Sequence, residues 1–154
     1  LATCGPALVD LGGDCALRGE PPEGRWIVAV ERPDRSAEPL AQLALGPGGV
    51  ATSGTNRRRW RSGERWSHHL IDPRTGGAAE TDLDQVTALH PSAARAEVWA
   101  KTALVAGSAA AQALAGRVAG LELMLVPSVG APFATAGAVA AATGRSQRGE
   151  AARN

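Results

Sequence analysis

The chain has 154 residues, of which 44% are hydrophobic and 20% charged, and its formal net charge is +1. This length and composition predict one globular domain with a real core, and they exclude a disordered chain. The small net charge provides no field over the whole molecule that would favour nucleic acid or a membrane surface. Two cysteines, Cys4 and Cys15, are too few for a disulfide framework, and we interpret them as small buried thiols.

The chain begins abruptly at Leu1, without a charged segment followed by an apolar one, which predicts that an upstream part is missing. An alanine-rich stretch covers residues 103–142, but Gln112, Arg117 and Glu122 interrupt it. No apolar run therefore approaches the roughly 20 residues that a membrane span requires. We expect a soluble piece.

Short strands are predicted along the first half of the chain. Ala7–Leu11 is expected to be a buried strand that stops at residues 12–14. A second strand is expected at 25–30, after a loop rich in proline and glycine, and two more on either side of the turn 46–48. Polar and apolar residues alternate over 66–71, which predicts a strand whose end carries polar groups. These expected strands cover residues 7–11, 25–30, 40–45, 49–53 and 66–71.

Helices are predicted in the second half. After an expected strand at 82–89, Ser92 is a suitable N-cap and Gly107 a suitable stop for a helix over 93–107. Ser108 would then cap a second helix over 109–114, and a strand would follow at 121–126. The charged segment 144–154 is expected to be a disordered tail. Strands followed by helices predict an α+β domain, with a mixed or antiparallel sheet and helices packed on one face.

Three polar clusters that contain glycine lie at the ends of expected strands: Asp10–Asp14, residues 52–54 and residues 69–76. Glycine allows a sharp turn and a close approach of backbone amides to a ligand, and hydroxyl groups and a histidine beside such amides suit an anionic or planar polar ligand. Each cluster taken alone is explained at least as well by an ordinary turn.

Taken in order, these clusters resemble the ApbE family of FAD:protein FMN transferases. The matching segments are V-D-L-G-G-D at 9–14, W-I-V at 26–28, V-A-T-S-G at 50–54, H-L-I-D-P-R-T-G at 69–76 and A-E-V-W-A-K-T-A-L at 96–104. The resemblance covers residues 7–143, and we assign residues 1–143 to the C-terminal portion of an ApbE-like domain. It implies a fold related to the T-fold, truncated at its N-terminus.

The resemblance also implies a reaction. A family member holds FAD with its diphosphate beside Mg²⁺ and directs a threonine hydroxyl of an acceptor protein at the FMN phosphorus. AMP leaves, and FMN stays on the acceptor as a phosphoester. Such a reaction requires neutralisation of the phosphate charge, alignment of the attack and removal of the hydroxyl proton.

His69 is the candidate catalytic residue, because its ordinary pKa lies near neutrality and Asp72, Thr75 and Gly76 follow it at the family spacing. The alternative is a strand histidine that only bonds nearby backbone. His68 is expected to point to the opposite face of the strand.

The other candidate residues would bind FAD. Thr52, Ser53 and Gly54 are expected to line the flavin or phosphate pocket. Thr75 and Gly76 would offer a hydroxyl and amides, with a plain turn as an equally weighted alternative. Asp14 would either contact the ligand or cap the Gly-Gly turn. The residues of this group are Asp14, Thr52, Ser53, Gly54, Thr75, Gly76 and Lys101.

The metal site departs from the family pattern. Family members usually carry Asp, and Thr four residues later, on one helix face. Here Glu97 takes the acid position and Lys101 the fourth residue after it, while Thr102 falls on the neighbouring position. Glu97 can bind Mg²⁺ through oxygen, whereas a charged Lys101 cannot. Two interpretations remain open: Lys101 is a cation directed at phosphate, or the metal site is weakened.

The run R-R-R-W-R at 57–61 could suggest nucleic acid, but without a positive net charge we interpret it as a solvated turn. A secondary interpretation is contact with an acidic acceptor surface or with the adenosine phosphates.

Three functions are consistent with these residues: FMN transfer, FAD binding without catalysis, and FAD pyrophosphatase activity without an acceptor. The resemblance implies that an N-terminal half supplies further flavin contacts, so we expect this chain alone to be inactive or weak. Relatives of this bacterial family act in different compartments, some of them at the outer face of the cytoplasmic membrane on membrane complexes. The compartment, the acceptor and the oligomeric state are therefore left open.

Overall fold

The computed structural model describes residues 5–143, so the predicted tail and Cys4 lie outside the described residues. Within that range the chain is an α+β domain, as predicted. The strands and helices are β1 Ala7–Leu11, β2 Asp14–Arg18, β3 Trp26–Val30, β4 Ala41–Leu45, β5 Gly48–Gly54, β6 Arg59–Ser62, β7 Arg65–His68, β8 Leu83–His90, α1 Ala93–Ala106, α2 Ser108–Ala115, β9 Glu122–Pro127, β10 Phe133–Ala134 and α3 Ala136–Ala141.

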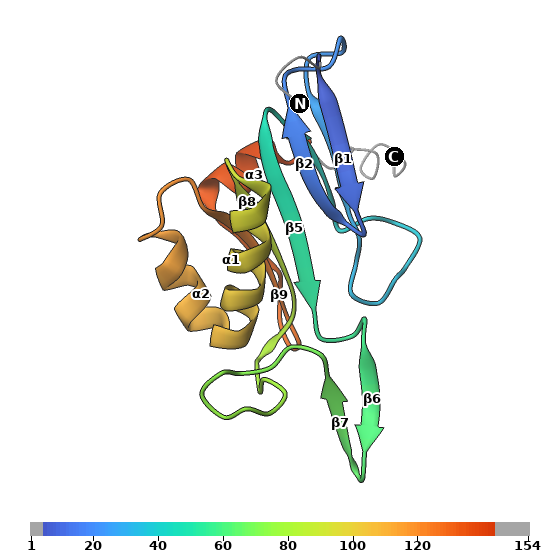
Figure 1. Ribbon diagram of the computed structural model, residues 1–154, viewed down its shortest axis with the longest axis vertical. Coiled ribbons are helices and arrows are strands. Elements are labelled where there is room, and N and C mark those ends of the chain that lie inside the picture. The colour runs from blue at the N-terminus through green and yellow to red at the C-terminus, as the bar shows by residue number, and fades with distance from the viewer. Residues whose placement is uncertain (1–4, 144–154) are drawn as a thin grey trace, which may run out of the picture.

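The main sheet has six strands in the order β1-β2-β5-β8-β9-β10, and every neighbouring pair is antiparallel (Figure 1). Two further antiparallel pairs, β3–β4 and β6–β7, lie outside this sheet. The strands β4 and β5, expected on either side of one turn, therefore belong to different sheets. In the part of the chain that the structure describes, no helix is long and apolar enough to cross a membrane.

The first predicted strand continues into a hairpin. Gly12 and Gly13 adopt φ values of 73° and 100°, which suit a two-residue hairpin turn and disfavour other residues. The chain reverses there and forms β2, with Leu11 opposite Asp14. The prediction of a buried β1 is wrong: β1 is an edge strand, and Leu11 is 77% exposed. Apolar residues alone do not distinguish a buried strand from an edge strand.

A second hairpin replaces the turn expected at 57–61. Residues 59–62 form β6, which pairs with β7, and all four residues of β6 are exposed. The hairpin extends away from the main sheet (Figure 1). The strand β7 ends at His68, earlier than the predicted residue 71, and His69 therefore lies in the segment that leads back to the body of the protein.

Two hydrophobic cores lie on the two faces of the main sheet. The first core joins the sheet to α1 and α2, with Ala100, Leu104 and Leu123 fully buried. The second core joins it to β3, β4 and α3, with Leu43 fully buried and Cys15 nearly so. Cys15 is thus a buried free thiol, as predicted. The predicted one-sided covering applies to α1 and α2, while the short α3 belongs to the other face.

Helix α1 packs very closely on β5. A Cβ atom placed on Gly49 would lie 2.2 Å from the Cα atom of Ala93, so only glycine fits at this point of β5. Ser92 precedes the helix as predicted, but its side chain makes no cap hydrogen bond, and Gly107 ends the helix with φ 84°. The close contact fixes the first turn of α1 over the sheet and thereby the height of Glu97 and Lys101 above it.

Candidate functional site

Helix α1 carries an ion pair close to the start of β2. Lys101 Nζ donates to Glu97 Oε1 over 2.6 Å, one helical turn apart. The side chains are about half exposed, 49% for Glu97 and 44% for Lys101. Thr102 is also exposed, but its hydroxyl donates to the Val98 carbonyl oxygen at 2.8 Å. The Glu97 carboxylate is therefore paired with the Lys101 ammonium, and the Thr102 hydroxyl is bonded to the helix backbone.

Asp14, the first residue of β2, lies within electrostatic reach of this pair. Burial raises the pKa of the Asp14 carboxyl, and the Glu97 carboxylate raises it further, while Lys101 and a hydrogen bond from the Thr52 backbone lower it. The Gly-Gly turn is capped by a different residue, since Gly13 N–H donates to Asp10 Oδ1 at 2.7 Å. Asp10 therefore caps this turn, and a contact of Asp14 with a ligand stays a prediction.

One ring nitrogen of His69 is buried and unpaired among the described residues. Within the described residues its buried Nδ1 has no hydrogen-bond partner, although its backbone N–H donates to the Arg58 carbonyl oxygen at 3.2 Å. Burial is the main cause that lowers the pKa of His69; the Arg58 backbone opposes this, and the positive charges of Arg58, His68 and Lys101 lower it further. His69 is therefore neutral at neutral pH and lies close enough to Lys101 to feel its charge.

His68 is a structural residue by comparison. Its Nε2 lies 3.0 Å from the Ala79 carbonyl oxygen, and its Nδ1 accepts a hydrogen bond from Leu70 N–H at 3.3 Å. Both ring nitrogens are thus occupied by the backbone of the following loop. The two neighbouring histidines therefore differ: the His68 ring is held by backbone atoms, whereas His69 Nδ1 has no partner within the described range.

The predicted pocket residues of β5 do not share one face. Thr52 Oγ1 lies 2.9 Å from Thr87 Oγ1, and Thr52 lines a cavity of about 410 Å³ together with Cys15 and Val28, on the β3–β4 side. Ser53, the next residue, is 8% exposed and points to the α1 side, because side chains alternate along a strand. The two side chains therefore lie on opposite faces of the sheet, and the expectation that Thr52 and Ser53 line the flavin or phosphate pocket stays a prediction.

Gly54 ends β5, where a Cβ atom would come within 3.2 Å of both the Asn56 side chain and the Asp84 carbonyl oxygen. The space beside Gly54 is therefore filled by protein atoms. Close packing therefore explains why position 54 is a glycine. A direct contact of Gly54 with FAD stays a prediction.

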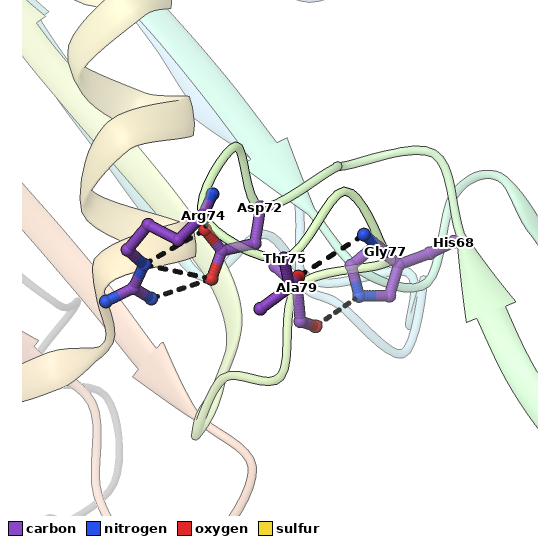
Figure 2. Close-up of polar contacts among 6 residues, drawn as sticks. All are labelled: His68, Asp72, Arg74, Thr75, Gly77 and Ala79. Carbon is purple, nitrogen blue, oxygen red and sulfur yellow. Dashed lines mark hydrogen bonds and ion pairs between the residues drawn. The ribbon is translucent and has the colours of Figure 1, made fainter.

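The segment 72–77 forms a closed loop (Figure 2). The buried Asp72 carboxylate accepts hydrogen bonds from Arg74 Nη2 at 2.7 Å and from Arg74 Nε and N–H, and these bonds hold the pKa of Asp72 below its usual value. Thr75 Oγ1 accepts from Gly77 N–H at 3.2 Å, and Gly76 N–H donates to the Asp72 carbonyl oxygen at 2.8 Å. Hydrogen bonds within the loop therefore stabilise its conformation, and Thr75 and Gly76 form the turn that was their alternative interpretation. The exposed Thr75 hydroxyl can still donate its hydrogen to a ligand.

Four predicted residues are therefore linked through Lys101, which is bonded to Glu97 and lies within electrostatic range of Asp14 and His69. They come from β2, from the segment after β7 and from one turn of α1. Their chemistry is a neutral imidazole and an ammonium between two carboxyl groups. Such a set can receive a proton and bind an anion in one place.

The predicted metal ligand does not fit this arrangement. In residues 5–143 no three His, Cys, Asp or Glu side chains are grouped so that they could hold a metal ion. Glu97 Oε1 is bonded to an ammonium, and Lys101 offers no oxygen. Mg²⁺ requires several oxygen ligands in a near-octahedral arrangement. The residues present do not supply them.

One contributor to the site, and a cavity on the opposite face of the sheet, were missed in the sequence. Arg58 holds the backbone of His69, and it belongs to the run interpreted as a solvated turn. The cavity beside Thr52 was missed because β2 was not predicted. The alternation of apolar residues after Gly13, with Cys15 and Leu17 both buried, was the available signal.

Comparisons with known proteins agree with this fold. The model of the ApbE family matches residues 2–125. The FAD:protein FMN transferase of Salmonella typhimurium is 33% identical over 130 residues, which cover 83% of this chain and 37% of that protein. The enzyme of the same name from Escherichia coli K12 is 32% identical with the same coverage.

Solved structures extend the agreement to three dimensions. The ApbE protein of Thermotoga maritima superposes with a TM-score of 0.78 at 26% identity, over 90% of this chain and 45% of that one. Flavin transferase ApbE from Vibrio cholerae gives 0.68 at 27% identity, over 84% and 42%. The chain spans a little over a third of the length of the curated relatives. A family model that matches most of the chain, together with these relatives, shows that it belongs to the ApbE family.

Proposed function

We propose that this chain supplies part of the active site of an enzyme that transfers FMN from FAD to a threonine hydroxyl of an acceptor flavoprotein and releases AMP. The observation that carries the proposal is that the Glu97–Lys101 pair lies within electrostatic range of His69 and Asp14 in a member of this family. The curated relatives named above carry the transferase name.

The reaction forms a bond between the threonine Oγ and the FMN phosphorus. The bond from that phosphorus to the bridging oxygen breaks, and AMP leaves with this oxygen. His69, which is neutral and whose Nδ1 has no hydrogen-bond partner among residues 5–143, receives the hydroxyl proton at Nδ1 and returns it to solvent. Ser53 and Thr75 are retained as FAD contacts in this proposal.

The resemblance adds Mg²⁺ and an acceptor in a membrane complex. Mg²⁺ would neutralise the diphosphate charge as AMP departs. Because Glu97 is already bonded to Lys101, no step of the proposed reaction is assigned to a metal ion. The acceptor class follows from the resemblance alone and is tested with the reaction.

The experiment uses the product of the complete reading frame that encodes this chain, incubated with FAD and an acceptor domain that contains the target threonine. Mass spectrometry should find FMN added to the acceptor and AMP released. His69→Ala should lower the transfer rate about 100- to 10,000-fold, the usual contribution of a general base. His68→Ala is the matched control and should retain the rate within about tenfold.

Two outcomes would contradict the proposal. Free FMN together with AMP, and an acceptor of unchanged mass, would indicate a pyrophosphatase. Intact FAD that stays bound would indicate a binding module. A threonine-to-valine change in the acceptor must abolish the added mass if threonine is the target. The 154-residue chain alone should be inactive or weak.

A further inference from the structure

The ion pair on α1 differs from an ordinary pair on a solvated helix surface. Glu and Lys at positions i and i+4 are common neighbours on helices, and such pairs usually contact solvent alone. Here the charge of Lys101 acts on Asp14, which belongs to β2, and on His69, which follows β7. Residues from three separate segments of the chain thus lie within electrostatic range of one ammonium group, which is bonded to Glu97.

The ammonium lies where a cation beside Glu97 would have to lie. Its Nζ is 2.6 Å from Glu97 Oε1, which is a short charge-assisted hydrogen bond. A second cation on the same oxygen would be repelled by Lys101, and position 101 provides no oxygen ligand. A lysine has three N–H donors. The bond to Glu97 therefore leaves donors that can reach an anion.

The ammonium group of Lys101 can be reached by an anion from solvent. His69 is neutral and Lys101 is about half exposed, so the cation is accessible from solvent. The proposed substrate brings a diphosphate, whose bridging oxygen acquires charge as AMP leaves. A fixed cation beside that oxygen stabilises the developing charge without a metal ion.

We propose that Lys101 is the built-in cation of this site: it takes the place of a divalent metal ion beside Glu97 and binds the FAD diphosphate directly. This inference rests on the proposed function for the identity of the diphosphate. Glu97 is then a positioning residue that holds the ammonium, and it is not a metal ligand.

Binding measurements test the inference without the transfer reaction. Calorimetry on the complete protein in EDTA should detect FAD binding, and Lys101→Met should weaken it about tenfold or more, the effect of losing a hydrogen bond to a charged group. Lys101→Arg should restore most of the affinity. Arg95→Met removes an exposed cation from the same helix and serves as the matched control, with affinity within about twofold. Equal affinities in wild type and Lys101→Met would overturn the inference.

Metal titrations provide an independent readout. The wild-type protein should show no Mg²⁺ binding that depends on Glu97. Lys101→Thr releases the carboxylate and adds a hydroxyl oxygen, so it should bind Mg²⁺ at least tenfold more tightly than wild type. Failure of that gain would show that Lys101 is not what excludes the metal, and Mg²⁺ binding by wild type that Glu97→Gln removes would also overturn the inference.

The transfer assay separates this inference from the proposed function. Wild type in EDTA should keep its rate within about twofold of the rate in Mg²⁺. A rate that disappears in EDTA and returns with Mg²⁺ would sustain the transferase function and overturn the role of Lys101. Absence of transfer under both conditions would contradict the proposed function. The two binding experiments would still show whether Lys101 or Mg²⁺ is the cation beside Glu97.

Discussion

The two faces of the main sheet differ in how closely they are covered. On the α1 face, Gly49 and a row of buried alanines let the helix approach until backbone nearly touches backbone. On the β3–β4 face, Cys15, Thr52 and Val28 surround a cavity of about 410 Å³. The close face fixes charged groups at defined positions, whereas the open face leaves volume. The small side chains between α1 and the sheet therefore determine the positions of Glu97 and Lys101.

The largest expected effect is on the closely packed face. Leu104 is fully buried among short side chains of α1, so Leu104→Ala leaves a cavity that its alanine neighbours cannot fill. We expect a loss of about 3–5 kcal/mol in the free energy of unfolding, the upper part of the range for such changes. Leu43→Ala, at an equally buried position of the other face, should cost about 2–3 kcal/mol. Denaturant unfolding of both variants measures the difference, and equal losses would remove the distinction between the faces.

Gly49→Ala tests the close approach directly. The added methyl group would overlap the backbone of Ala93, and α1 must shift to accept it. Overpacking of this kind costs about 1–3 kcal/mol. Gly116→Ala is the control, because its φ is −75° and its nearest new contact is 3.8 Å away. A stable Gly49→Ala protein would contradict the fixed height of α1, and a shift of α1 should also weaken FAD binding.

On the open face, Thr52→Val should have a smaller effect. The change removes the hydrogen bond between the Thr52 and Thr87 hydroxyls but preserves the side-chain shape. We expect a loss of about 1 kcal/mol in the free energy of unfolding. Because the Thr52 backbone, and not its hydroxyl, bonds to Asp14, FMN transfer should continue. A large loss of transfer with normal stability would instead indicate that FAD occupies the cavity.

The smallest effect concerns pH. The pKa of Asp72 is held below its usual 3.8, first of all by the Arg74 side chain. A carboxyl with a lowered pKa in the folded state stabilises the fold above its unfolded pKa, and this contribution disappears as the pH falls through the folded pKa. Arg74→Met should therefore lower the free energy of unfolding slightly at pH 6, and the difference from wild type should shrink as the pH falls below 3.8. A difference that persists in acid would contradict this explanation.

The pH dependence of the FMN transfer rate at acidic pH tests the protonation state of His69. Because burial lowers its pKa below 6.5, the imidazole should accept protons at pH values where an exposed histidine is already charged. The pH dependence of transfer should therefore decline only below pH 6.5. A decline that begins above pH 6.5 would contradict a neutral His69.

The sequence by itself determined the chemistry that is available. The stretch from His69 to Gly76, the acid and lysine one turn apart on a helix, and the glycines at 12–13 were all identified from local pattern, because turns and helix faces depend on neighbours in the chain. The α+β class and the ends of α1 followed from the same local signals. The prediction of a buried β1 was wrong, and the turn predicted at 57–61 was incomplete because residues 59–62 form a strand of a hairpin.

Only the tertiary structure decided which of these groups meet. Edge and central strands have similar apolar sequences, so the position of β1 depends on partners elsewhere in the chain. The grouping of Asp14, His69 and Lys101 depends on the packing of α1 over β5 and on the hairpin that holds the His69 backbone. Contacts between distant segments decide whether a lysine lies at a solvated surface or near a histidine and two carboxyl groups. Such contacts cannot be predicted from the local sequence.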